Sequence, residues 1–227
     1  MSSREPVSRR TRPAKAPLSR AAIVDAALRV LERDGGSKLT MRRVAAELDT
    51  GPASLYVYVR NTTGLHALLI DRLLASLDLA WDGAEPWRER LHRVLADYRG
   101  LLAERPEIAR GALSVWPDGP NYLDLVELLL RLLAAAGVDQ RAAAWAVDLL
   151  LQHVSAAAAE WAERAADAGQ DLDDLSATLA SADPRRHPVL ASFDTALLTA
   201  GDPEIRDRWA VDVLIDGVLA RSAPAGA

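Results

Sequence analysis

The stretch TMRRVAAELDTGPASLYVYVRN, residues 40–61, carries the side chains of this chain that are best suited to contact a polyanion. Its first half contains two adjacent arginines, and its second half contains hydroxyl groups and small apolar residues but only one charge, Arg60. Arginines neutralise phosphates, hydroxyls reach phosphates or base edges, and methyl groups contact thymine in the major groove. The pattern therefore fits recognition of duplex DNA, although the spacing alone does not decide it. The alternative is a helical hairpin whose tyrosines pack at a domain boundary and whose arginines are solvated.

Two helices are expected to precede the turn in this stretch. Ser19 can cap the first helix, whose apolar residues recur at three- and four-residue spacing until Asp34. Thr40 can cap the second, Met41 to Leu48, which keeps its apolar residues on one face and Arg42 outside.

A tight turn and a third helix should follow. Asp49 tolerates the left-handed conformation that ends a helix, Gly51 can cap the next one, and Pro52 suits its first turn. The third helix should run to about Val59. Two helices joined by so short a connection form a helix-turn-helix.

Charge is divided unevenly along the chain. Residues 1–60 hold 12 Lys and Arg against 6 Asp and Glu, whereas residues 61–227 hold 15 against 26. Residues 1–17 are rich in Pro, Ser and Arg and lack apolar periodicity, which indicates a flexible basic arm. A small basic module before a larger acidic one suggests that only the first meets a polyanion. A solvated basic tail is the alternative reading.

The remainder of the chain is expected to be helical, so the predicted fold class is all-α. Residues 18–63 form a three-helix helix-turn-helix DNA-binding domain, and residues 64–227 form a larger helical domain for ligand binding and dimerisation. Apolar stripes between proline and glycine breaks predict its helices. They include a long helix from about Asp139 to Ala168 and a last one from Pro203 to Ala220. A loop is expected around residues 183–187.

Two of these helices carry more apolar or small surface than one buried stripe requires. Small residues let helices approach closely, so we expect a four-helix interface between two subunits. A dimer also has a functional use, because two recognition helices about 34 Å apart read a palindrome. These helices could instead close the core of the monomer. The residues expected at the interface are Ala156, Ala159, Ile205, Trp209 and Val213.

The segment LTMRRVAAELDTGPASLYVYVRNTTGLHALLIDRLL, residues 39–74, resembles the DNA-binding domain of the TetR family of bacterial transcriptional regulators. Its most specific element is LYVYVRN, residues 55–61. A weaker resemblance, to the C-terminal domain of the tetracycline-repressor branch, runs through PWR at residues 86–88 and WAVDVLIDGV at residues 209–218. The resemblance implies a ligand-responsive transcriptional regulator, by default a repressor. Such a protein binds a palindromic operator in double-stranded DNA as a homodimer, and a small molecule releases it.

The resemblance also implies roles for individual residues. Arg42 takes the place of a base contact, Thr40 that of a phosphate contact, and Tyr56 that of a tyrosine that holds the DNA backbone. The other DNA-facing positions are Arg43, Ala53, Ser54, Val57, Tyr58, Arg60 and Thr62. Thr62 stands where family members usually carry Lys, and Asp49 stands where they usually carry Gly. Both departures reduce positive charge near DNA.

The aromatic composition indicates a cavity in the larger domain. The chain has 6 Trp and 4 Tyr but a single Phe, and Trp and Tyr combine apolar area with a polar tip that can orient a ligand. Leu69 and Leu73 on the fourth helix continue from the DNA-binding domain into this region. For each residue, ordinary core packing is the alternative. The resemblance places Tyr98, Trp116, Tyr122, Trp145, Gln152 and His153 around the ligand.

Rival functions receive little support from the sequence. The 4 His show no metal-ligand spacing, and the motifs GxSxG and GxGxxG do not occur. We therefore expect no enzymatic activity, no cofactor and no metal. The absence of Cys and of an export signal predicts a cytoplasmic protein without a membrane partner. A helical protein-interaction module that keeps the hairpin without specific DNA binding is the alternative function.

Overall fold

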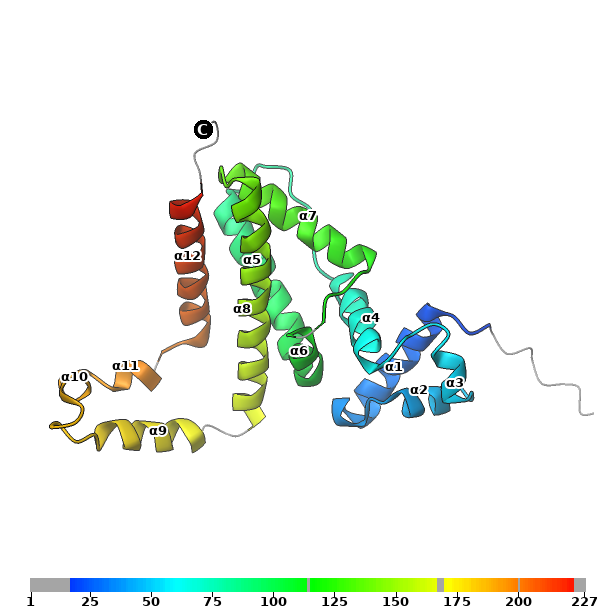
Figure 1. Ribbon diagram of the computed structural model, residues 1–227, viewed down its shortest axis with the longest axis horizontal. Helices are drawn as coiled ribbons and strands as arrows, with labels where there is room; N and C mark the ends of the chain where they lie inside the picture. Colours follow the sequence, from blue (N-terminus) through cyan, green and yellow to red (C-terminus); the bar gives the residue numbers. More distant parts are fainter. Residues whose placement is uncertain (1–16, 114, 167–169, 200, 223–227) are drawn as a thin grey trace, which may run out of the picture.

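The computed structural model describes residues 17–113, 115–166, 170–199 and 201–222. Within these ranges every regular element is a helix, which confirms the all-α class. The predicted arm lies outside the described residues except for Pro17. In Figure 1 the first helices form a small unit at one end, and the later helices form a larger body beside it.

Local caps start the helices of the N-terminal unit where the sequence predicts. The side chain of Ser19 accepts a hydrogen bond from the backbone N–H of Ala22 at 3.1 Å. In the same way, Thr40 accepts from the N–H of Arg43 at 3.2 Å. The elements here are α1 (Arg20–Asp34), the 3₁₀ helix η1 (Gly36–Lys38), α2 (Met41–Glu47) and α3 (Pro52–Leu55).

The turn between α2 and α3 has the predicted backbone, but α3 is shorter than expected. Asp49 adopts a left-handed φ of 49°. α3 ends at Leu55 rather than near Val59, and the backbone N–H groups of Tyr58 and Val59 both donate to the carbonyl of Leu55. Aromatic and β-branched residues have lower helix propensity. The chain therefore leaves the helix at Tyr56 and closes with a turn.

The fourth helix begins at a side-chain cap that the turn presents. Asn61 accepts a hydrogen bond from the N–H of Gly64 at 2.8 Å and so starts α4 (Thr62–Leu74). α4 belongs to both parts of the molecule, because it packs on α1 in the N-terminal unit and on α6 and α7 in the larger body.

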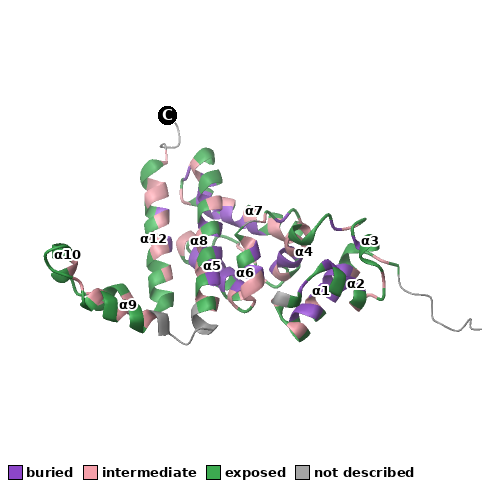
Figure 2. Ribbon diagram, turned by 60° about the horizontal axis from the view of Figure 1, so that its bottom comes forward, coloured by how far each residue is buried: buried purple, intermediate pink, exposed green. Residues whose placement is uncertain are grey.

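Helix α8 is the central element of the larger body. It packs against α5, α6, α7 and α12, and the buried residues concentrate along these contacts (Figure 2). Residues Gln140–Glu163 of α8 are apolar enough to span a membrane, yet half of the window is buried in the body, as in the core helix of a globular protein. The helices are α5 (Trp87–Ala103), α6 (Pro106–Ala112), α7 (Pro120–Ala135), α8 (Gln140–Ala166) and α12 (Pro203–Arg221).

Three helices between α8 and α12 were not predicted. They are α9 (Gln170–Ala180), α10 (Pro188–Ala191) and α11 (Ala196–Thr199), and Figure 1 shows them projecting away from the body. Two of them are only four residues long, too short to display a helical period in the sequence.

Removal of the Thr40 cap tests how the helix-turn-helix is fixed. Thr40→Ala deletes the acceptor for the N–H of Arg43 and should lower the free energy of unfolding by about 1 kcal/mol. Thr40→Ser keeps the hydroxyl and should retain most of this stability. Chemical denaturation followed by circular dichroism measures the difference. Equal values for the two variants would show that the cap does not stabilise the domain.

Candidate DNA interface, ligand cavity and subunit interface

The helix α3 and the turn after it present a short exposed face. Ala53 and Ser54 on the helix are exposed, and the side chains of Tyr56 and Val57 in the turn are 53% and 80% exposed. Tyr58 differs from the prediction in part, because it is half-buried against the core. The face is therefore small and uncharged, and small apolar and hydroxyl side chains of this kind can contact base edges in a major groove.

The two arginines of α2 have different surroundings. Arg42 is exposed and forms no ion pair with another described residue. Arg43 instead contacts Asp34, with Nε 3.0 Å and Nη2 2.9 Å from Oδ2. Hydrogen bonds from Arg33 and Arg43 lower the pKa of Asp34 to about 2. The structure thus ties Arg43 to α1 through a contact that the sequence does not reveal. Its contact with DNA stays a prediction.

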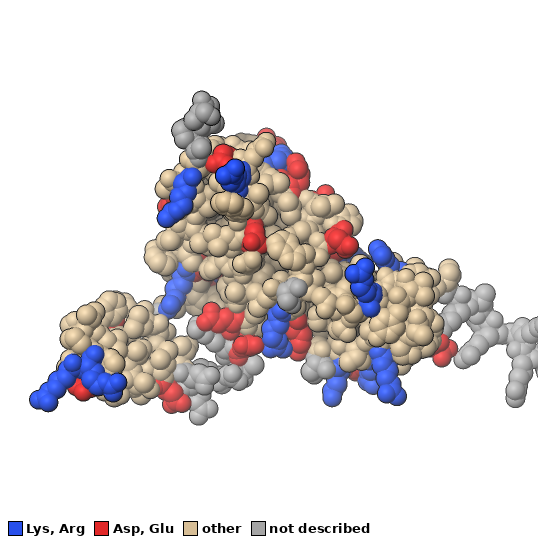
Figure 3. All heavy atoms as spheres, in the orientation of Figure 1, with Lys and Arg blue, Asp and Glu red and all other residues tan. Residues whose placement is uncertain are grey.

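Positive and hydroxyl side chains flank the face of α3. Arg60 and Thr62 are exposed where α4 begins, and Thr40 is exposed at the start of α2. Lys and Arg gather over the N-terminal unit (Figure 3). Arg20 also braces this region, since its Nε donates to the carbonyl of Tyr58 at 3.2 Å. Hydroxyls and backbone N–H groups at helix starts are well placed for phosphates.

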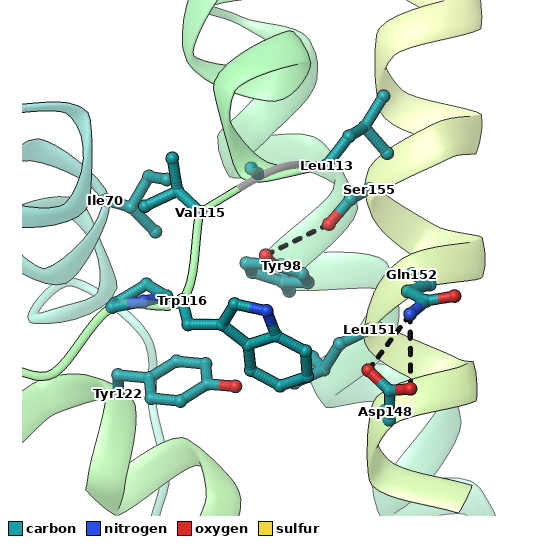
Figure 4. A pocket seen from close by; sticks show the side chains of 12 residues that line it. Ile70, Tyr98, Leu113, Val115, Trp116, Tyr122, Asp148, Leu151, Gln152 and Ser155 are labelled. Atoms are coloured by element: carbon teal, nitrogen blue, oxygen red, sulfur yellow. Dashed lines mark hydrogen bonds between the residues drawn. The ribbon is translucent and has the colours of Figure 1, made fainter. Parts of the chain in front are cut away.

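A cavity of about 80 Å³ lies between α4, α5, α8 and the segment that joins α6 to α7 (Figure 4). Two buried hydroxyl groups in its lining, those of Tyr98 and Ser155, lie 3.2 Å apart and form a hydrogen bond. Burial raises the pKa of Tyr98. The described lining residues are Ile70, Tyr98, Ala112, Leu113, Val115, Trp116, Pro117, Tyr122, Asp148, Leu151, Gln152 and Ser155.

Half of the predicted ligand residues line this cavity. Tyr98, Trp116, Tyr122 and Gln152 do so. Leu69, Leu73, Trp145 and His153 do not line it. Sequence reasoning missed Ile70, Asp148 and Ser155, which also line the cavity. Ile70 directly follows the predicted Leu69, and Asp148 and Ser155 each lie three positions after a predicted residue on α8.

The other four predicted residues lie elsewhere for physical reasons. Leu69 is fully buried in the core, and Leu73 is half-buried against it, because one residue along a helix turns a side chain by 100° and only Ile70 meets the cavity. Nε2 of His153 lies 3.5 Å from Asp207 on α12. Trp145 is 70% exposed on the outer side of α8.

A buried carboxylate joins α4 to the first turn of α7. Asp71 is 9% exposed and accepts hydrogen bonds from the backbone N–H of Tyr122 at 2.9 Å and from the amide of Asn121 at 3.0 Å. Asp71 therefore caps α7 from another helix. Gly119 makes room for it, since a Cβ atom there would overlap the carboxyl group. The sequence gives no signal for this contact across 50 residues.

The outer faces of α8 and α12 form an apolar surface. Trp145 and Leu149 on α8 are 70% and 41% exposed, and Trp209 and Val213 on α12 are 68% and 49% exposed. Ile205 at the start of α12 is exposed as well. α12 holds its position through its other side, where Val211 and Ile215 are buried and Asp207 lies 2.9 Å from Nη1 of Arg99.

Two alanines predicted at the subunit interface differ in placement. Ala156 is exposed on α8, but Ala159 is 7% exposed and packs inside its own chain. Residues three apart on a helix lie about 60° apart around its axis, so the boundary between the exposed and the buried side of α8 falls between these two alanines. The place of Ala159 at a subunit interface stays a prediction.

Comparison with known proteins identifies the chain. Residues 23–67 match the model of bacterial regulatory proteins of the tetR family, and residues 81–222 match that of the tetracyclin repressor-like C-terminal domain. The protein belongs to the TetR family. It is therefore a ligand-responsive DNA-binding transcriptional repressor, and homodimers on palindromic operators are typical of the family.

Individual TetR-family relatives agree with the model matches. The repressor DrrR1 of Streptomyces coeruleorubidus is 30% identical over 80% of this chain and 72% of its own. The solved transcription regulator SCO7704 of Streptomyces is 47% identical, covering 94% of this chain and 100% of its own, with a TM-score of 0.79. Apo ActR of Streptomyces coelicolor is 32% identical, and the match covers 90% of this chain and 98% of ActR, with a TM-score of 0.81. The matches to curated relatives span between 49% and 74% of the length of each relative.

Restoring the family's usual charge at Thr62 tests the DNA interface. Thr62→Lys should add one phosphate contact and steepen the slope of log K against log salt by about 0.9. Thr62→Gln lengthens the side chain without adding a charge, so this variant should show the same slope as the wild-type protein. Fluorescence anisotropy on a duplex selected by the wild-type protein measures both. An unchanged slope for Thr62→Lys would place this residue away from the phosphates.

A charge on the apolar surface tests the subunit interface. Val213→Arg places a guanidinium where α8 and α12 of two subunits should pack, so a dimer should dissociate to monomers. The matched variant Leu123→Arg alters a residue of α7 that is 62% exposed away from this surface and should remain dimeric. Sedimentation velocity distinguishes the two states. A dimeric Val213→Arg protein would contradict the assignment.

Proposed function

We propose that α3 enters the major groove of each operator half-site, that α8 and α12 join the two subunits, and that a small molecule in the cavity releases the DNA. Arg42, Ala53, Ser54, Tyr56 and Val57 contact the operator. Thr40, Arg60 and Thr62 contact its phosphates. The protein works in the cytoplasm, as family regulators generally do. DNA-binding residues 18–63 and ligand-binding and dimerisation residues 64–227 are its two functional parts.

The buried contact of Asp71 is the observation that carries this proposal. α4 starts at the turn after α3, where we expect phosphates to bind. The carboxylate of its Asp71 accepts a hydrogen bond from the first turn of α7, beside the cavity. A buried carboxylate needs its hydrogen bonds, because leaving it or the N–H of Tyr122 unpaired costs about 1–3 kcal/mol. A shift of α7 therefore moves α4 with it.

The size of the cavity explains why a ligand would cause such a shift. Drug-sized ligands occupy sites of about 300–1,000 Å³, whereas this cavity measures about 80 Å³. Entry must displace part of the wall. The side chain of Trp116 is 69% exposed and lies in the segment that leads into α7, so it is the most readily displaced part.

Trp116 also borders a second hollow that reaches the DNA-binding domain. That hollow is lined by Trp116 and Asp118 on one side and by Arg20, Arg60 and Asn61 on the other. Displacement of Trp116 by a ligand would thus act next to the turn that holds the phosphates. One side chain contacts both the ligand cavity and the DNA-binding domain.

Helix α6 supplies a second rigid contact between the two parts. A Cβ atom at Gly111 would lie 2.8 Å from Nδ1 of His66 on α4, so the two helices pack without space for a side chain. α6 also packs against α8. Because such tight packing resists compression, movement of α6 or α7 is transmitted to α4. ActR, a relative at 32% identity, has been solved with actinorhodin and with (S)-DNPA, which supports a small-molecule effector.

The coupling role of Asp71 is testable with any compound that thermal-shift screening shows to bind the wild-type protein. Asp71→Ala removes both hydrogen bonds to α7 and should lower the free energy of unfolding by about 1–3 kcal/mol. The compound should still bind, but it should release operator DNA at least tenfold less effectively. Calorimetry measures ligand binding, and anisotropy measures DNA release.

Asp97→Ala is the matched control, because it removes an exposed carboxylate from α5. This variant should bind the compound and release operator DNA as the wild-type protein does. Full release by Asp71→Ala at equal ligand occupancy would refute the coupling through Asp71. Failure of every bound compound to release DNA from the wild type would refute the proposed function itself.

A further inference from the structure

The ligand cavity has an unbalanced charge. Among the described residues that line it, Asp148 is the only charged one, and no Lys, Arg or His is present. The other carboxylate nearby, Asp71, is engaged by the first turn of α7. An anion entering this cavity would meet a carboxylate and no cation, whereas a cation would meet a partner.

Asp148 has capacity left for a ligand. Both of its oxygens accept from the amide nitrogen of Gln152 at 3.1 Å, and this contact orients the carboxylate on α8. An ionised carboxylate offers about four acceptor sites on two oxygens, so the Gln152 amide leaves sites unused. Gln152 brings no charge that would neutralise Asp148.

Aromatic rings surround the space in front of this carboxylate. Figure 4 shows the indole of Trp116 and the phenol of Tyr122 between α7 and α8, with Tyr98 behind them. The face of an aromatic ring attracts cations, and several rings beside a carboxylate are the arrangement that binds organic ammonium groups. Burial and the charge of Asp148 raise the pKa of Tyr122, which is consistent with a negative potential in the cavity.

We propose that the cavity selects an organic cation, a planar aromatic compound that carries a protonated amine, with the ring against Trp116 and Tyr122 and the ammonium at Asp148. This inference rests on the proposed function and specifies the ligand of the same site. The apolar wall of Ile70, Val115 and Leu151 accommodates the hydrocarbon part. Carboxylate-bearing compounds of the same shape are excluded by Asp148.

Three compounds of nearly equal shape separate charge from ring size: 2-naphthylmethylamine, protonated at pH 7, 2-naphthylmethanol and 2-naphthoate. Isothermal titration calorimetry with the full-length protein should give the tightest binding for the amine, at least tenfold tighter than for the carboxylate. Asp148→Asn keeps the shape of the side chain and removes its charge. In this variant the preference for the amine should fall to less than threefold.

Asp124→Asn provides the matched control, because it removes an exposed carboxylate of α7 that does not line the cavity. It should keep the wild-type preference. Equal or tighter binding of 2-naphthoate would overturn the ligand class and leave the cavity as the effector site. A preference for the amine that survives in Asp148→Asn would equally overturn the role of Asp148. Absence of binding by all three compounds would count against both the ligand class and the site.

Discussion

Helix α4 must satisfy two partners at once, and the arrangement of the rest of the molecule depends on this constraint. Its start is fixed by Asn61 at the edge of the DNA-binding domain, and its last turn is fixed by Asp71, a buried carboxylate whose hydrogen-bond donors lie on α7. Burying an ionised group is costly unless hydrogen bonds compensate it. Because the compensation comes from α7, the helix that follows the turn after α3 cannot rotate independently of the cavity wall. Gly111 and Gly119 keep the neighbouring helices close enough to maintain both contacts.

Sequence reasoning succeeded where neighbouring residues determine the structure. The caps at Ser19 and Thr40 and the left-handed Asp49 depend on a few consecutive residues, so the start of each helix and the turn could be predicted, although the end of α3 at Leu55 could not. Predictions failed where a rotation about a helix axis or a distant partner decides. Ile70 rather than Leu69 meets the cavity, and Asp34 holds Arg43 from another helix. Asp71 and Tyr122 lie 51 positions apart, and no local pattern marks their contact.

The tryptophans illustrate how one compositional signal covers different roles. The 6 Trp suggested a single aromatic cavity, but the structure distributes them among several environments. Trp116 lines the cavity, Trp145 and Trp209 are exposed on the apolar surface of α8 and α12, and Trp161 lies under the guanidinium of Arg99 at 4.4 Å from the ring centre. Each use exploits the same combination of apolar area and a polar or polarisable ring. Composition therefore did not reveal which of these environments each Trp would occupy.

The central claim is that occupancy of the cavity changes the separation of the two recognition helices through α4. The chain has no Cys, so Lys38→Cys, at an exposed position of η1 outside the proposed DNA contacts, introduces one spin-label site per subunit. Pulsed electron spin resonance on the dimer then measures the distance between the labels with and without a bound compound that releases DNA. The account predicts a distribution that shifts by several ångström on binding, away from the value compatible with major grooves about 34 Å apart. An unchanged distribution at saturating compound, with DNA still released, would contradict it.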